Sequence, residues 1–377
     1  MKKSILLSGI LMLGAAALPA QAQQTVTFLG YSGLFQERYT KAVIEPFTAA
    51  NPDIKVEYFP QQGSAAMLGS LRAQKAAPQA DVALMDVSVA KTGTDEGLFD
   101  KIDESVTKNV ADLYPNARFE GVAGVGVTFD NLVLIYNTDA IKTAPDSWNA
   151  LKDSALKGKV AMLSAPDIVG IGTTIIMDHM NGGTDFIKNI DAGINAMAEV
   201  APNIQTWEPK PEVYPNVVNG QVSLGVGWNA RSQVNADGSK GKMKVALPKE
   251  GTILQINTLN LVKGGPSSEA GRKFVDYALS PEAQAAFTAA MYYAPTNTKA
   301  TVADDVSERT VIKAMDKVIP VDWIGLSMVR DQITQDWRRP VTPHSRHSSR
   351  VEWQIFRLRP GAAARQNNAF PLSTQRR

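Results

Sequence analysis

The chain has 377 residues, of which 44% are hydrophobic, no cysteine, and a formal charge of +2. This length allows two ordinary domains or one bilobed body, and the lack of cysteine excludes a small secreted scaffold held by disulfides. Residues 341–377 contain seven arginines and one acidic residue. The rest of the chain is therefore acidic, and the overall charge does not indicate nucleic-acid binding.

The first 22 residues have the features of a secretory signal peptide. Lys2 and Lys3 precede an apolar run over residues 5–18, and Ala20-Gln21-Ala22 fits the small-x-small cleavage rule. The apolar run is too short for a stop-transfer helix, and nothing after residue 22 reaches transmembrane length. We predict cleavage after Ala22 and an exported chain that does not span a membrane. In a bacterium with two membranes it would stay in the periplasm.

The next part of the chain alternates strands and helices, which is typical of an α/β fold. After a strand at 25–29, Phe35, Tyr39, Val43 and Phe47 recur every four residues and predict a helix with one buried face. Pro46 lies inside this helix and should kink it. Further strands are predicted at 54–58 and 81–85, and further helices at 65–76 and in a segment ending near Gly97.

Two long β-rich runs, at 125–136 and 253–262, enclose a second α/β block. Within that block we predict a helix start at 148–151, strands at 159–163 and 222–226, and helices at 172–180, 184–200 and 211–219. Helices at 268–279 and 281–291 follow, the second with Ser280 as its N-cap. Leu326, Val329, Ile333 and Trp337 mark an amphipathic terminal helix.

This order predicts two α/β lobes joined by crossover hinge strands near Asp130 and Asn257. We expect lobe 1 to comprise 23–128 and 256–303, lobe 2 to comprise 129–255, and C-terminal helices at 304–340 to pack on the lobes. A cleft between two lobes is where ligands collect. Residues 341–377 have no periodic apolar face, and we expect a disordered tail that is foreign to the fold.

The chain contains short motifs such as Lys157-Gly158-Lys159-Val160, Trp228-Asn229-Ala230-Arg231 and Tyr293-Ala294-Pro295-Thr296-Asn297. Together with others in the same order, they resemble the periplasmic solute-binding proteins of ABC importers. The resemblance is to the bilobed type II cluster that includes polyamine, ferric-iron and thiamine binders, and it covers about residues 25–339. It implies a monomeric receptor without a cofactor, which captures a small polar solute and delivers it to an inner-membrane ABC permease. The motifs are Ala42-Val43-Ile44-Glu45-Pro46-Phe47, Asp81-Val82, Gly97-Leu98, Tyr136-Asn137-Thr138, Ser147-Trp148, Lys157-Gly158-Lys159-Val160, Asn219-Gly220-Gln221-Val222, Trp228-Asn229-Ala230-Arg231, Tyr293-Ala294-Pro295-Thr296-Asn297 and Asp322-Trp323 through Trp337.

Candidate contacts lie at three places in lobe 1 where a loop or strand leads into a helix. Tyr31 and Ser32 follow the first strand, where helix N–H groups and a hydroxyl can hold an anion or polar ligand, and the resemblance places ligand loops here. Ser32 could equally cap the helix. Ser64, before the next helix, is a weaker case of the same kind. Asp86 ends an apolar strand and could neutralise an ammonium group or cap the following helix.

The strongest candidates in lobe 2 are Trp228, Asn229 and Arg231. Arg231 could clamp a carboxylate or phosphate while Trp228 packs on the apolar part of the ligand. The alternative is a surface arginine and a core tryptophan. On the returning strand, Gln255 and Asn257 stand where the polyamine binders that the chain resembles carry tryptophan and aspartate. This makes a polyamine ligand a minority interpretation.

The sequence contains few of the residues and motifs that an enzyme or a metal centre would need. His179 is the single histidine before residue 341, and no G-x-S-x-G, H-E-x-x-H, P-loop or complete G-x-G-x-x-G motif is present. Tyr292 and Tyr293 resemble the paired tyrosines of ferric binders, but their motif favours packing. We expect no metal site and no enzyme, with a carboxylate-based secreted lyase or hydrolase as the alternative. An adhesin would need repeats, and none is evident.

Overall fold

The computed structural model describes residues 23–342, so the predicted signal peptide and residues 343–377 lie outside the described residues. Its strands form one mixed sheet in the order β2-β1-β3-β10-β5-β8-β6-β7. The strands are β1 (Gln24–Tyr31), β2 (Ile54–Gln61), β3 (Val82–Asp86), β4 (Phe99–Asp100), β5 (Val125–Asn137), β6 (Val160–Ala161), β7 (Ile204–Thr206), β8 (Leu224–Trp228), β9 (Met243–Ala246), β10 (Leu254–Val262) and β11 (Ala294–Pro295).

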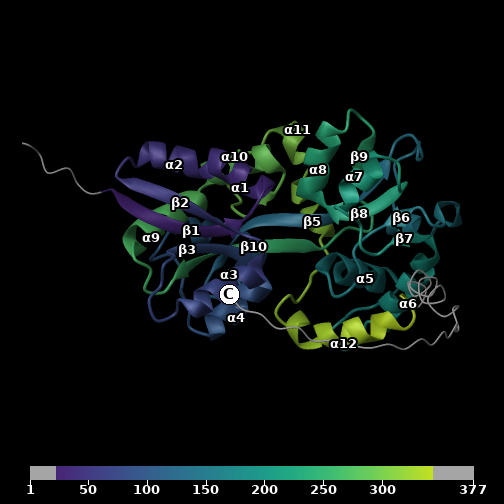
Figure 1. Ribbon diagram of the computed structural model, residues 1–377, viewed down its shortest axis with the longest axis horizontal. Coiled ribbons are helices and arrows are strands. Elements are labelled where there is room, and N and C mark those ends of the chain that lie inside the picture. Colours follow the sequence, from purple (N-terminus) through teal and green to yellow (C-terminus); the bar gives the residue numbers. More distant parts are fainter. Residues whose placement is uncertain (1–22, 343–377) are drawn as a thin grey trace, which may run out of the picture.

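Helices cover both faces of this sheet (Figure 1). The α-helices are α1 (Leu34–Tyr39), α2 (Glu45–Ala50), α3 (Ser64–Ala73), α4 (Val87–Asp95), α5 (Ile168–Met180), α6 (Asp191–Val200), α7 (Val213–Val218), α8 (Asn229–Gly238), α9 (Ser268–Ala278), α10 (Pro281–Met291), α11 (Asp304–Ser307) and α12 (Leu326–Arg338). Shorter 3₁₀ turns are η2 (Lys108–Asp112), η3 (Pro115–Ala117), η4 (Trp148–Lys152), η5 (Ser154–Leu156), η6 (Ala201–Asn203) and η7 (Val311–Lys317). The α/β fold class predicted from the sequence is confirmed.

The first part of the sheet is parallel, with β1 between β2 and β3. Its strands carry buried residues that pack on helices at both faces, with α3 and α4 below the sheet and α1, α2 and α10 above it in Figure 1. Phe28 of β1 meets Tyr39 of α1 and Phe274 of α9 at ring-centroid distances of 5.4 Å. These aromatic contacts hold the helices on the strand that ends at Tyr31.

The helix around Pro46 is irregular, as expected from the proline within it. A π-helical turn, η1 (Thr40–Ile44), separates α1 from α2, and Pro46 is the second residue of α2. Proline has no N–H and its ring clashes with the carbonyl four residues earlier, so a wider turn accommodates it. The buried stripe of Phe35, Tyr39, Val43 and Phe47 continues through this turn.

Strand β5 joins the two parts of the sheet. Its first half pairs antiparallel with β10, with Asp130 opposite Gln255 and Thr128 opposite Asn257. Its second half pairs with β8 and β9. All thirteen residues of β5 are buried, as expected of a strand covered on both faces. The paired crossover strands expected near Asp130 and Asn257 are therefore present.

Some predicted elements are shorter in the structure. The helix expected at 184–200 begins only at Asp191, because the Asp185 side chain accepts the Ile187 N–H and Asn189 accepts the Asp191 N–H. Such local side-chain bonds compete with helical ones. The strand expected at 159–163 consists of Val160 and Ala161 alone, and the helix start at 148–151 is the 3₁₀ turn η4.

The terminal helix α12 packs by the predicted stripe, in which Leu326, Ile333 and Trp337 are buried. The Trp337 ring meets Trp207 at 4.9 Å, and its Nε1 donates to Thr174 Oγ1 at 2.9 Å. Val341 is only 1% exposed, so the predicted tail boundary at 341 is wrong and the packed body includes this residue. Within residues 23–342, no helix has the length and apolar character needed to cross a membrane.

Candidate functional site

A cleft of about 520 Å³ opens where β5, β8 and β10 meet the ends of β1 and β2. Both parts of the sheet contribute to its wall. Its lining residues are Tyr31, Gln62, Asp130, Leu163, Asp167, Ile168, Val169, Pro209, Lys210, Pro211, Glu212, Val213, Tyr214, Val226, Trp228, Arg231, Gln255 and Tyr293. The mixture of aromatic rings with a few charged groups is typical of small-molecule sites.

Asp130 places a buried carboxylate at this cleft. It is 1% exposed, and its Oδ1 accepts the backbone N–H groups of Asn131 at 2.9 Å and Ala230 at 3.0 Å. Its Oδ2 is buried and has no hydrogen-bond partner. Burial raises the pKa of Asp130 to about 7, although the two N–H groups and nearby Arg231 favour its ionised form. A buried oxygen without a partner is uncommon in native proteins and indicates a place for a donor from outside.

Arg231, in the first turn of α8, brings a cation to the same cleft. Its Nη1 lies 2.6 Å from Oε1 of Glu212, which precedes α7. Burial is the largest single effect and lowers the pKa of Arg231, but Glu212, Tyr214, Tyr293 and Asp130 together outweigh it, so the pKa of Arg231 lies above its ordinary value. Trp228, one turn earlier at the end of β8, lines the cleft beside Arg231. The sequence predicted Trp228 and Arg231 as ligand contacts, and both line this cleft. It did not indicate Glu212.

Tyr31 reaches the cleft from the end of β1 and is held by three of the other predicted residues. Its hydroxyl donates to Asn257 Oδ1 at 3.0 Å and lies 2.8 Å from Ser64 Oγ. Ser64 Oγ in turn accepts the Asp86 N–H at 2.9 Å. Asn257 is fully buried, and Tyr31 is the member of this group that lines the cleft.

Asp86 itself serves as the N-cap of α4. Its Oδ1 accepts the Ser88 N–H at 3.0 Å and the Ser88 hydroxyl at 2.7 Å. Burial raises the pKa of Asp86, while these bonds and the more distant Arg330 lower it. The capping interpretation therefore describes Asp86 better than a direct contact with a ligand ammonium.

Ser32 and Asn229 lie outside the cleft wall. The Ser32 N–H donates to Gln61 O at 3.0 Å, and the N-cap of α1 is Gly33, whose φ of 73° suits glycine. Asn229 is 4% exposed and donates to Arg309 O at 2.9 Å. Its Oδ1 accepts a hydrogen bond from Gln233 Nε2. The Asn229 amide therefore has its hydrogen-bond partners within the protein, on α8 and on the chain that follows α10.

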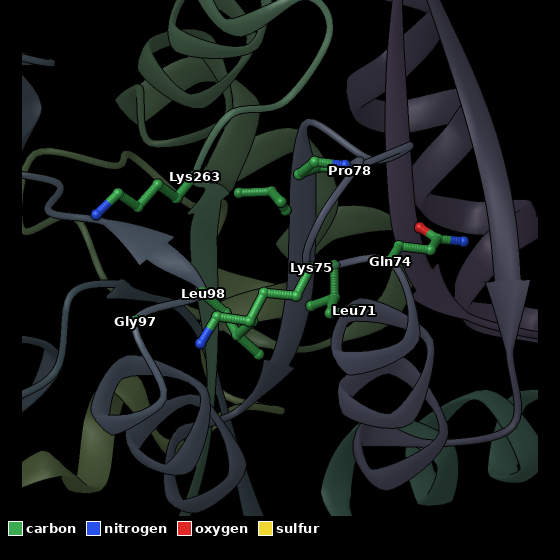
Figure 2. Close-up of a pocket in the computed structure, with 8 residues that line it drawn as sticks. Leu71, Gln74, Lys75, Pro78, Gly97, Leu98 and Lys263 are labelled. Carbon is green, nitrogen blue, oxygen red and sulfur yellow. The ribbon is translucent and has the colours of Figure 1, made fainter.

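A second cavity, of about 270 Å³, lies at the opposite end of β10 from Gln255 (Figure 2). Lys75 and Lys263 line it together with Leu71 and Leu98. The Lys75 ammonium already donates to Glu96 O at 2.5 Å. Because this cavity is remote from Asp130 and Arg231, its residues provide controls for experiments on the cleft.

Two tyrosines that the sequence singled out have separate roles. Tyr293 is buried against Phe35 and Phe287 and presents one edge to the cleft. The Tyr292 hydroxyl donates to Asp237 and accepts from Arg309, away from the cleft wall. Among residues 23–342, no group of three or more histidine, cysteine or acidic residues could hold a metal ion.

The sequence did not identify Asp130, Glu212, Tyr214, Gln62 or Asp167 as cleft residues. Asp130 stood out only as a hinge position, although a lone acid within an apolar run at 125–136 is itself a signal of a special environment. Glu212 and Tyr214 border a proline-rich segment and carry no motif, so only the folded arrangement brings them to Arg231.

The family model of the bacterial extracellular solute-binding proteins matches residues 42–314, which is well over half of the chain. The chain belongs to this family. A γ-aminobutyric acid-binding protein of Pseudomonas aeruginosa is 23% identical over 74% of this chain and 80% of its own length. A spermidine/putrescine-binding periplasmic protein of Escherichia coli is 24% identical over 74% and 80%. A crystal structure of a putative extracellular solute-binding protein from Bordetella parapertussis has a TM-score of 0.73 at 22% identity, and the match covers 85% of this chain and 100% of that one.

The family assigns the general role of the chain. It is a solute receptor of an ABC importer, which binds a small molecule outside the cytoplasm and presents it to a membrane permease. The resemblance seen in the sequence is thereby confirmed. The relatives are binding proteins, so they give no support to the alternative of a secreted lyase or hydrolase.

Proposed function

We propose that this receptor captures a small solute with a primary ammonium group and that Asp130 binds this group. The observation that carries the proposal is the Asp130 Oδ2 atom, which is buried at the cleft and lacks a partner. An ammonium donates charge-assisted hydrogen bonds to a carboxylate, and such bonds are about twice as strong as neutral ones. Tyr31 and Trp228 would surround the alkyl part of the solute.

The ligands named for the two relatives support this chemistry. γ-Aminobutyric acid, spermidine and putrescine differ in their other groups, but each carries a primary amine on a short alkyl chain. A carboxylate at the cleft is the group that all three would require. The volume of about 520 Å³ suits solutes of this size.

The mechanism that we propose is closure of two lobes. Residues 23–128 and 256–303 form lobe 1, and residues 129–255 form lobe 2. Asp130 and Gln255 face each other across β5 and β10, where the strands pass from one part of the sheet to the other. Bending at this point would bring Tyr31 toward Trp228 and Arg231. Tyr31, Trp228 and Arg231 remain the predicted contacts, with Ser64, Asp86 and Asn257 orienting Tyr31.

The remaining details of the role are proposals as well. We infer a monomeric receptor in the periplasm, directed there by residues 1–22, that needs no cofactor and returns its solute chemically unchanged. It would dock on an inner-membrane permease and would not bind nucleic acid.

Calorimetric titration of residues 23–377 tests the proposal with matched solutes. We expect binding of 4-aminobutyrate or putrescine and none of butyrate or 1,4-butanediol, which lack the amine. Asp130→Asn keeps an acceptor for the Ala230 N–H but removes the charge, so amine affinity should fall at least tenfold, as loss of a charge-assisted bond implies.

Lys263→Ala, in the second cavity, is the matched control and should leave amine affinity unchanged. Chromatography of the solute after incubation should return it intact. Failure of every amine to bind the wild-type protein, or full affinity in Asp130→Asn, would contradict the proposal.

A further inference from the structure

The ion pair between Arg231 and Glu212 lies within the cleft, where a solute meets it. Both residues line the cavity, and their side chains are 42% and 49% exposed. Solvent, or the end of a bound solute, can therefore reach both charged groups. The pair is formed between α8 and the residue that precedes α7, so both of its residues come from the segment between β5 and β10.

The Glu212 carboxylate has no other structural task within residues 23–342. Although Glu212 stands at the N-cap position of α7, its side chain does not cap the helix. The contact that holds it is the 2.6 Å approach to Arg231 Nη1. Glu212 also follows Pro209-Lys210-Pro211, whose fixed backbone angles restrict where the carboxylate can go.

Asp130 does not neutralise Arg231 directly. In the described part of the chain, no distance of 4 Å or less joins an Arg231 nitrogen to an Asp130 oxygen, although each charge affects the pKa of the other. The cleft thus holds one carboxylate without a counter-ion in direct contact and one cation whose counter-ion is Glu212. A half-exposed pair of this kind adds little stability, so another acid can replace its carboxylate at low cost.

We propose that Glu212 is an internal counter-ion for Arg231 that the acid group of a solute replaces. Glu212 thereby determines whether the cleft prefers a zwitterionic ω-amino acid or a diamine. The inference rests on the proposed binding of the ammonium by Asp130. Once Asp130 holds the ammonium, the acid group at the other end of the same solute lies close to Arg231. Its effective concentration there is therefore high, and it competes with Glu212 for Arg231. A diamine instead places its second ammonium beside Arg231 and relies on Glu212.

Reciprocal variants test this role. Affinities are measured for zwitterions and diamines of equal chain length: β-alanine with 1,3-diaminopropane, 4-aminobutyrate with putrescine, and 5-aminovalerate with cadaverine. In Glu212→Gln the acid competitor is lost, so the ratio of zwitterion to diamine affinity should rise about fivefold, the equivalent of one exposed ion pair. In Arg231→Gln the ratio should fall by at least as much. Lys263→Ala should leave it unchanged.

The outcomes separate the two proposals. If amines bind and Asp130→Asn abolishes binding, but Glu212→Gln leaves the ratio unchanged, Glu212 is only a surface partner and this inference fails alone. A ratio that falls in Glu212→Gln would also overturn it. If no amine binds, the proposed function itself fails. Circular dichroism melting curves within a few degrees of wild type confirm that the variants are folded.

Discussion

Under the proposed function, Asp130 combines a structural and a ligand-binding task in one side chain. Its Oδ1 anchors the first turn of α8 through the Ala230 N–H, while Oδ2 is buried without a partner in a residue that lines the cleft. Ionisation of this group in the empty cleft is unfavourable because burial raises the pKa of Asp130 to about 7. A bound ammonium would supply the missing counter-charge.

Amine binding should consequently depend on pH. Above about pH 7 Asp130 is ionised and affinity should be constant, whereas below pH 7 affinity should fall by nearly tenfold per pH unit. Arg231, Tyr214 and Tyr293 face Asp130 and keep their charge states between pH 5 and 8, since the pKa of each is raised. Calorimetric titrations of Asp130→Asn with an amine, at steps of half a pH unit, should give an affinity that does not change with pH. A dependence of affinity on pH as steep as that of the wild type would refute this assignment.

The stability of the unliganded protein should change in the opposite direction. A carboxyl whose pKa is higher in the folded state stabilises the fold below its unfolded-state pKa near 4, and this contribution is lost as pH rises through about 7. Relative to wild type, Asp130→Asn should therefore become more stable between pH 5 and pH 8, by up to about 1.4 kcal/mol per pH unit. Urea unfolding at both pH values gives this difference, and a value independent of pH would contradict it.

Secondary structure elements are defined locally in this chain, but their ends are set by packing. The stripe of Leu326, Ile333 and Trp337 was readable from its spacing because a helix buries every third or fourth residue. The C-terminal end of the packed body could not be predicted from the sequence, because Val341 stands beside polar and basic residues and belongs to no periodic apolar pattern. It is buried because the turn that follows α12 brings it back against the core, with its N–H donating to Trp337 O at 3.1 Å.

Two truncations should distinguish the two boundaries. A chain ending at Thr342 keeps Val341, and a chain ending at Pro340 loses it. Full burial of a valine contributes about 1.5–3 kcal/mol, so residues 23–340 should unfold at lower urea than residues 23–342. Equal urea midpoints for the two chains would show that Val341 contributes nothing to stability.

The arrangement of the whole molecule places the cleft at the crossing strands. In Figure 1, β5 and β10 run between the part of the sheet with β1–β3 and the part with β6–β8, while α12 extends along one side. A solute that touches both parts favours the closed arrangement only by contacts that the open one lacks. Under the proposed function, Tyr31 on one side, with Asp130, Trp228 and Arg231 on the other, would supply such contacts.

Small-angle scattering of residues 23–377 tests closure of the lobes. Saturating 4-aminobutyrate should reduce the radius of gyration of the wild-type protein, because the lobes approach each other around the solute. Asp130→Asn at the same concentration should keep the unliganded radius. An unchanged radius in the saturated wild-type protein would mean that the cleft does not close.

The sequence by itself determined the α/β class and the two long strands, because periodicity and turn residues act over a few neighbouring positions. The family was indicated by the resemblance of its ordered motifs. The sequence also indicated Tyr31, Trp228 and Arg231, since each lies at or just after the end of a strand. Only the tertiary structure decided that Asp130 has an unpaired buried oxygen, that Asn229 is committed to packing, and that Glu212 neutralises Arg231. Burial and partners depend on segments that are distant in the chain, and no local pattern records which of them meet.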